Sequence, residues 1–176
     1  MSSADAGGDL SEGTFRDHCL AAAERYAAGF VHGDLPSAPA RRAAVVTCMD
    51  ARMETGRLLG LAEGDVHVIR NAGGVVTDDV LRSLTISQRL LGTREIIVIQ
   101  HTGCGMMTFR DDDLKDEIEA ETGLRPPFAM EAFTDLEANV RQSLRRIQAC
   151  PFLPIRDHAS GFVYDVKTGR LAEVSL

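Results

Sequence analysis

The residues of this chain best suited to metal chemistry are a histidine and two cysteines. His101 and Cys104 are three positions apart, in a Gln-His-Thr-Gly-Cys-Gly segment that directly follows the apolar run 96–99. A short β-branched run predicts a buried strand, so the imidazole and the thiol would lie at its carboxyl end. These two side chains provide half of a site for a borderline-soft metal such as zinc, and a third ligand would complete it.

Cys48 is the candidate for the third ligand. It ends another apolar run, 43–48, and is followed by Asp50 and Arg52. A third polar and glycine-bearing group, residues 70–74, follows the next expected strand. The carboxyl ends of parallel strands lie at one edge of a sheet, which is where ligands bind in such folds. We therefore expect all three groups to meet at the same edge.

Two other interpretations fit the same three ligand candidates. Buried cysteines beside a satisfied core histidine would be structural, and a cysteine beside a histidine base would be a nucleophile. Asp50 and Arg52 favour a metal site, because the carboxylate could be a fourth ligand or could be held away from the metal by a bidentate ion pair. An open fourth position would take water, whose pKa zinc lowers from about 15.7 toward about 7.

The order of the expected elements predicts an α/β fold. Apolar runs alternate with helical patterns, which is typical of a mostly parallel central sheet flanked by helices with right-handed crossovers. The expected strands are 42–48, 65–70, 96–100, 161–165 and 170–174, of which the last two form an antiparallel C-terminal pair. The expected helices are 11–30, 53–61, 77–91, 111–122 and 130–149.

The first expected helix is separated from the rest of the chain by a proline-bearing linker, 33–40. Its apolar stripe comprises Phe15, Cys19, Ala22, Ala23, Tyr26 and Phe30. Such a helix could fold back on its own domain or pack on a partner subunit. Residues 1–10 are expected to form a flexible tail before it, with Ser11 as the helix cap.

Length and composition place the chain among ordinary globular proteins. Its 176 residues predict one domain, and 44% hydrophobic and 26% charged residues are typical of a soluble protein. The net charge of -7 argues against a nucleic-acid partner, and no apolar run approaches the roughly 20 residues of a membrane span. The N-terminus lacks a signal-peptide pattern and the four cysteines are not spaced as in small secreted proteins, so we expect a cytoplasmic protein.

Three motifs, in this order, resemble those of the β-class carbonic anhydrases, in particular the compact bacterial subgroup. They are Cys48-x-Asp50-x-Arg52, Arg70-Asn71-Ala72-Gly73 and His101-x-x-Cys104-Gly105, and the resemblance spans roughly residues 40–110. It implies Zn2+ as the cofactor, with Cys48, His101 and Cys104 as its ligands. It also implies reversible hydration of carbon dioxide to bicarbonate and a proton, by attack of zinc-bound hydroxide.

The resemblance assigns roles to further residues around the metal. Asp50 with Arg52 would form a gating and proton-accepting dyad, and Asp50 could turn onto zinc as a fourth ligand. The residues expected to shape the loops or contact substrate are Arg70, Asn71, Gly73 and Gly105. Gly103 and Gly105 would let the ligand-bearing turn fold tightly around the ion.

The family's assembly would account for the detached first helix. The resemblance implies a homodimer or higher homo-oligomer in which residues 11–32 pack on the other subunit. Two alternative functions stay open on the same site. One is hydrolysis of a carbon dioxide isostere, carbon disulfide or carbonyl sulfide, which related proteins carry out with the same ligands. The other is a catalytically silent zinc-binding regulatory protein, whose fourth position is closed by Asp50.

The chain departs from the common family pattern at three positions near the first ligand. Met49 and Ala51 stand where many members have serine, while the ligand and dyad positions are intact. Val45 stands where members with an allosteric bicarbonate pocket have tryptophan. Val45 at this position favours a zinc ion whose fourth position is open and carries water.

Overall fold

The computed structural model describes residues 13–176 and divides the chain into two units, Met1–Leu35 and Pro36–Leu176. The expected tail 1–10 and the expected cap Ser11 lie outside the described residues. In the first unit, helix α1 spans Phe15–Ala28, and Thr14 is its N-cap. The Thr14 side chain accepts a hydrogen bond from the Asp17 amide, and the Asp17 carboxylate accepts one from the Thr14 amide, a reciprocal capping box.

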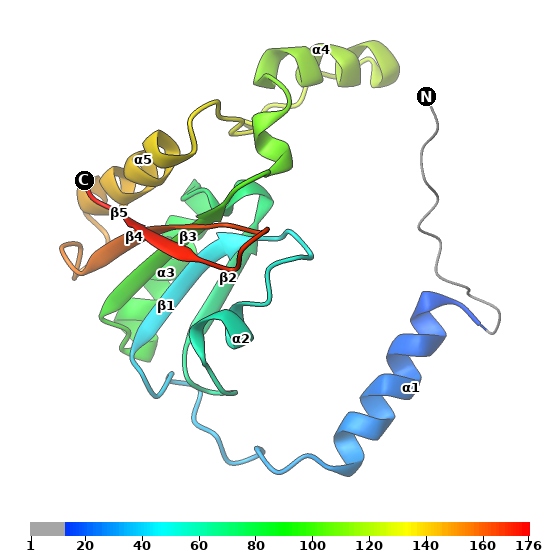
Figure 1. The fold of residues 1–176 in the computed structure, drawn as a ribbon, viewed down its shortest axis with the longest axis vertical. Helices are drawn as coiled ribbons and strands as arrows, with labels where there is room; N and C mark the ends of the chain where they lie inside the picture. Colours follow the sequence, from blue (N-terminus) through cyan, green and yellow to red (C-terminus); the bar gives the residue numbers. More distant parts are fainter. Residues whose placement is uncertain (1–12) are drawn as a thin grey trace. The chain divides into compact units, whose positions relative to one another are not determined.

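The second unit alternates strands and helices (Figure 1). Its strands are β1 (Ala43–Cys48), β2 (His67–Asn71), β3 (Glu95–His101), β4 (Ala159–Tyr164) and β5 (Leu171–Val174). Its α-helices are α2 (Thr55–Leu59), α3 (Asp78–Leu91), α4 (Asp111–Thr122) and α5 (Leu136–Ala149). Two single 3-10 turns, η1 (Ala72–Gly74) and η2 (Gly105–Met107), follow β2 and β3.

All five strands form one sheet in the order β2-β1-β3-β4-β5. The pairs β1–β2, β1–β3 and β3–β4 are parallel, and β5 runs antiparallel to β4. This confirms the predicted α/β class with its antiparallel C-terminal pair. Because β2, β1 and β3 are parallel neighbours, their carboxyl ends lie side by side, and the segments after them meet at one edge.

The two faces of the sheet have separate apolar cores. Helices α3 and α5 cover one face, where Leu84 and Leu144 pack against Val46 and Val98. Gly161 of β4 lets α5 approach closely, since a Cβ there would lie 2.5 Å from Val140 Cγ1. The other face holds Val45, Cys48, Met53, Ile99, Cys104 and Phe133, and is partly covered by α2. The candidate ligands therefore belong to the second core.

The predicted start of helix α5 at Met130 is wrong, because the helix begins six residues later, at Leu136. Asp135 caps it by accepting a hydrogen bond from the Ala138 amide at 2.9 Å. Upstream, Glu131 has a φ of 62°, a left-handed conformation that no helix interior contains. The amides of residues 130–132 donate to the Asp111 carboxylate instead of to helical carbonyls. Apolar periodicity alone did not distinguish this anchored loop from a helical turn.

Other boundaries moved by smaller amounts. Helix α2 is shorter than the expected 53–61, and strand β3 extends one residue further, so that His101 belongs to the strand itself. No helix among the described residues combines the length and the apolar character that crossing a membrane requires.

Candidate metal centre

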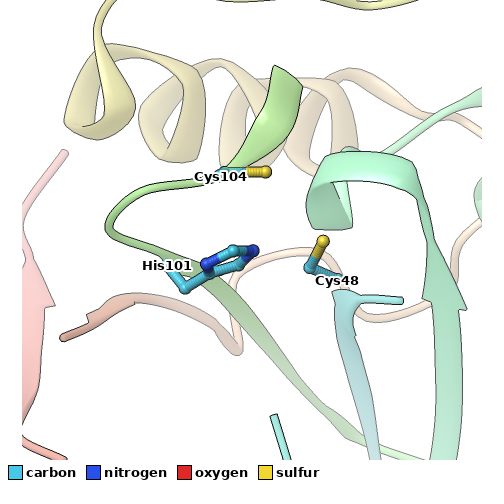
Figure 2. Close-up of side chains that lie close together, drawn as sticks. All are labelled: Cys48, His101 and Cys104. Atoms are coloured by element: carbon cyan, nitrogen blue, oxygen red, sulfur yellow. The ribbon is translucent and has the colours of Figure 1, made fainter. Parts of the chain in front are cut away.

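Three buried side chains converge at the carboxyl edge of the sheet. Figure 2 shows the sulfur atoms of Cys48 and Cys104 and the ring of His101 turned toward a common point. The ligand atoms of the three residues all lie within 4.8 Å of one another. Two thiolates and one imidazole are a donor set that suits zinc, and three protein ligands leave one tetrahedral position free.

The strand order explains how residues 53 positions apart come together. Thr47 of β1 pairs with Ile99 of β3, so Cys48 and His101 end adjacent parallel strands. The chain after His101 then turns back through Gly103, whose φ of 63° is a conformation that glycine adopts without strain. The turn returns Cys104 toward the strand ends, and the Cys104 carbonyl accepts a hydrogen bond from the Met107 amide at 3.1 Å.

The orientation of His101 supports a metal at this point. Its Nδ1 lies 3.0 Å from the Thr102 carbonyl oxygen, which places the ring proton on Nδ1 and a lone pair on Nε2. The side chain is fully buried, and Nε2 has no hydrogen-bond partner among the described residues. An unsatisfied buried nitrogen is costly, and a metal ion between Nε2 and the two sulfurs would satisfy it.

The pKa values of the two thiols are shifted in opposite directions. Burial raises the pKa of the Cys48 thiol, but the His101 imidazole and the backbone amides of Asp50 and Gly73 outweigh it and bring the pKa to about 7. Burial raises the pKa of the Cys104 thiol to about 11, although the Met106 amide acts in the opposite direction. The Cys48 side chain raises the pKa of His101. Cysteine binds a metal as the thiolate and histidine as the neutral imidazole, so a bound cation would displace protons from these groups.

Asp50 and Arg52 form a bidentate ion pair beside the three ligand candidates. Arg52 Nε and Nη2 donate to Asp50 Oδ1 and Oδ2 at 2.9 and 2.7 Å. Arg52 Nη2 also donates to the Gly103 carbonyl at 3.1 Å, which ties the pair to the ligand-bearing turn. Asp50 Oδ2 lies 3.6 Å from His101 Nε2. The Arg52 guanidinium holds the pKa of the Asp50 carboxyl well below its usual range, so the group is an anion at neutral pH.

Arg70 and Asn71 shape the backbone around the centre. Arg70 Nε donates to the Cys48 carbonyl at 2.9 Å, and its Nη2 donates to the Asp50 carbonyl at 2.8 Å. The Asn71 amide group donates to the Val75 carbonyl and accepts from the Val75 amide, which closes the loop around η1. Arg70 therefore holds the backbone of Cys48 and Asp50, and the Asn71 side chain holds the η1 loop beside them.

The glycines contribute differently from what the sequence indicated. A Cβ at Gly105 would meet no described atom within 4 Å, so the expected need for a tight turn does not hold there. A Cβ at Gly73 would lie 3.1 Å from Met106 Cγ and 3.2 Å from Phe133 Cε1. At Gly74 it would lie 2.9 Å from the Cys48 nitrogen, against backbone that cannot yield. The strict requirement for glycine is therefore at Gly74.

Two further polar residues near the site, Gln100 and Asn139, were not predicted from the sequence to contribute to it. The buried Gln100 amide donates to Asn139 Oδ1 at 2.6 Å and to the Gly74 carbonyl at 3.4 Å. This bond joins β3, α5 and the η1 turn. Asn139 follows no motif, and only the packing of α5 on the sheet brings it to Gln100. The Gly-Gly pair at 73–74 was the one local signal for this region.

A cavity of the second unit lies away from the candidate metal centre. It has a volume of about 900 Å3 and is bounded by α3 and the end of α5, including Leu81, Ile86 and Phe152. None of the candidate ligands or dyad residues lines it. Substrate chemistry therefore has to be considered at the carboxyl edge of the sheet, where the candidate ligands lie.

Comparison with known proteins places the chain in a family. A family model described as carbonic anhydrase matches residues 43–171. Beta-carbonic anhydrase 1 of Mycobacterium tuberculosis is 56% identical over 162 residues, which cover 92% of this chain and 99% of that protein. The chain belongs to the carbonic anhydrase family, in its β class.

Solved structures agree with this assignment. A carbonic anhydrase from Streptococcus mutans is 41% identical and superposes with a TM-score of 0.85, over 93% of this chain and 99% of that one. A more distant relative is a carbon disulfide hydrolase of Saccharolobus solfataricus, 33% identical over 74% of this chain and 76% of that protein. The resemblance predicted from three short motifs thus extends over most of the chain.

Proposed function

We propose that this protein is a zinc-dependent carbonic anhydrase that catalyses the reversible hydration of carbon dioxide to bicarbonate and a proton. The single observation that carries the proposal is the unsatisfied, fully buried Nε2 of His101, which faces the sulfurs of Cys48 and Cys104. These three residues would hold the ion. When bound, zinc supplies a Lewis acid that lowers the pKa of water toward about 7, so that a nucleophile is available at neutral pH.

Asp50 would orient the reacting water. Its carboxylate is ionised and has one oxygen 3.6 Å from the ligand nitrogen of His101, so it can accept a hydrogen bond from water at the open position. Arg52 holds both oxygens of this carboxylate, and this ion pair favours an Asp50 that stays off the metal. The dyad would thereby direct the water lone pair toward carbon dioxide and receive its proton.

The loop residues would position this machinery without touching the reacting atoms. Arg70 fixes the backbone of Cys48 and Asp50, and Asn71 closes the loop that contains Gly73. In this proposal Gly105 only begins the η2 turn, directly after Cys104. The contacts favour loop support over direct substrate binding for all four residues.

A stopped-flow assay of carbon dioxide hydration tests the proposed function. We expect one zinc per chain by elemental analysis and a hydration rate that rises between about pH 6.5 and 9, as water at the site loses its proton. Removal of zinc with a chelator should abolish hydration, and added zinc should restore it. Stoichiometric zinc without hydration at any pH in this range would contradict the proposal.

Two alternatives share the site and are separated by the same experiments. The relatives named carbon disulfide hydrolases favour testing carbon disulfide and carbonyl sulfide as substrates. Turnover of these isosteres without hydration would assign the chain to that activity. A silent regulatory protein would bind zinc but turn over none of the three substrates, with Asp50 as the fourth ligand. The higher identity to beta-carbonic anhydrase 1 favours hydration.

The proposal includes a homodimer or higher homo-oligomer of one-domain subunits, 1–176, in the cytoplasm. Considered by itself, the described part of the first unit leaves α1 without a buried residue. A 14-residue helix is only marginally stable in water without tertiary packing. The expected helix end at residue 30 is wrong, because α1 ends at Ala28. Its apolar stripe includes Phe15 and Tyr26, exposed to 71% and 56%, and a second copy of the chain is the partner that the family resemblance favours. The small-molecule substrate requires no nucleic acid or membrane.

The proposed exchange of residues 11–32 can be tested with one charge placed on either side of α1. Ala22 belongs to the apolar stripe, whereas Ala21 lies on the opposite side of the helix. We expect Ala22→Glu to weaken subunit association by roughly tenfold or more, because the carboxylate would be buried at the interface. Light scattering during dilution measures the association. Ala21→Glu is the control, and equal behaviour of both variants would contradict the exchange.

A further inference from the structure

A single arginine of helix α5 links two loops that approach the metal centre. Arg146 Nη1 donates to the Val76 carbonyl at 2.9 Å and to Glu131 Oε1 at 2.8 Å. Val76 follows the η1 turn after β2, and Glu131 lies in the loop before α5. These acceptors are 55 positions apart in sequence (131 − 76), so Arg146 joins two segments that are distant along the chain.

The first of these loops carries an amide that faces Cys48. The Gly73 backbone N–H lowers the pKa of the Cys48 thiol. The same loop packs directly on this residue, because a Cβ on Gly74 would lie 2.9 Å from the Cys48 nitrogen. Three residues after Gly73, both backbone groups of Val76 are hydrogen-bonded to α5. Its amide donates to Ser143 Oγ at 3.2 Å, and its carbonyl accepts from Arg146. The position of the Gly73 amide therefore depends on how α5 anchors this loop.

The second loop controls an amide that faces Cys104. The Met106 backbone N–H acts to lower the pKa of the Cys104 thiol. The Met107 amide donates to the Cys104 carbonyl at 3.1 Å, and the Met106 carbonyl accepts from the Phe133 amide at 3.1 Å. Phe133 follows Glu131 by two residues. The left-handed backbone of Glu131 is held by its ion pair with Arg146 and by the Asp111 carboxylate, which accepts from the amides of residues 130–132.

The two loops also touch each other beside the metal centre. A Cβ on Gly73 would lie 3.1 Å from Met106 Cγ and 3.2 Å from Phe133 Cε1. Phe133 is buried in the apolar cluster that contains Cys48 and Cys104. A shift of either loop would therefore disturb its packing against the other and move an N–H group away from a sulfur.

We propose that Arg146 is a positioning residue of the zinc centre, which through Val76 and Glu131 holds the two loops that pack beside Cys48 and Cys104 and direct backbone amides toward these ligands. The inference rests on the proposed function, in which Cys48 and Cys104 bind zinc. Hydrogen bonds from outside the ligand shell set the electron donation of a thiolate to its metal, and their loss typically lowers metal affinity about 10- to 100-fold. The same change alters the spectrum of a cobalt-substituted site.

The test uses the full-length protein with the substitutions Arg146→Gln, Arg146→Lys and Glu131→Gln. The control is Arg145→Gln, which changes the exposed arginine that directly precedes Arg146 in the same helix. Zinc affinity is measured by competition with a chromophoric chelator. The thiolate-to-metal charge-transfer bands are recorded after cobalt substitution, and circular dichroism shows that each variant is folded at the temperature used.

We expect Arg146→Gln and Glu131→Gln each to weaken zinc binding by about tenfold and to shift the cobalt bands. Combining them should add little, because both remove the same ion pair. Arg146→Lys, which retains the charge but loses the fork of donors, should be intermediate. Arg145→Gln should match the wild type.

The outcomes separate this inference from the proposed function. Wild-type zinc affinity and unchanged cobalt bands in folded Arg146→Gln and Glu131→Gln would overturn the positioning role alone, even if the variants melt at lower temperature. A wild-type chain that binds no zinc would overturn the zinc proposal and this inference with it. If Arg146→Gln does not fold, Glu131→Gln and Arg146→Lys decide by the same two measurements.

Discussion

Asp50→Ala is expected to retain one zinc per chain and to lower the rate of carbon dioxide hydration by about 10²- to 10⁴-fold, the usual contribution of a positioned proton acceptor. The three candidate ligands do not include Asp50, and its carboxylate accepts two side-chain hydrogen bonds from Arg52. Removing the carboxylate should therefore affect the orientation and deprotonation of water rather than metal binding. Elemental analysis and stopped-flow kinetics on the same preparation measure both quantities.

The isosteric change Asp50→Asn is the sharper control. An amide retains the size of the side chain but cannot form the ion pair with Arg52 or accept a proton. The pKa of Asp50 is lowered, so the carboxylate is already ionised throughout the assay range and contributes no inflection between pH 5 and 9. The residual activity of Asp50→Asn should therefore keep the wild-type inflection. Full activity with normal zinc in either variant would exclude the proposed dyad.

The part of the site that the sequence predicted depends on strand order. The ligand candidates were placed at one edge because each ends an apolar run, and parallel neighbours bring such ends together. The observed pairing of Thr47 with Ile99 is the contact on which that inference depended. Periodicity could locate Cys48 and His101 at strand ends, but the assignment of zinc chemistry required the motif resemblance in addition.

What the sequence could not predict are contacts made by isolated residues. Arg146 occupies an unremarkable position in an amphipathic helix, and its two acceptors lie in loops whose conformation no pattern specifies. In the sequence, Asp111 is only the first residue of the expected helix 111–122 and belongs to none of the three motifs. In the structure its carboxylate accepts three backbone amides of the loop at 130–132, and this anchoring is why α5 begins late. Such long-range bonds leave no local signal.

Gly74→Ala is expected to cost about 2–4 kcal/mol of unfolding free energy and to remove zinc from the protein. The φ of Gly74 is 64°, which an L side chain adopts at a cost of about 1 kcal/mol or more. The added Cβ would lie 2.9 Å from both Thr47 C and Cys48 N and 3.0 Å from Ile99 O. These are backbone atoms of two paired strands, so relief requires β1 and β3 to move at the point where the ligands follow.

Gly92→Ala separates the two causes of this effect. Gly92 ends helix α3 with a φ of 73°, but a Cβ there would meet no described atom within 4 Å. Gly92→Ala should therefore lower the unfolding free energy by only about 1 kcal/mol, the cost of the left-handed conformation, and the protein should keep its zinc. Urea unfolding and zinc analysis of both variants measure the difference. If Gly74→Ala behaved like Gly92→Ala, the backbone at the ends of β1 and β3 would be free to move. The close packing of the η1 turn against Cys48 would then not be what holds Cys48 in place.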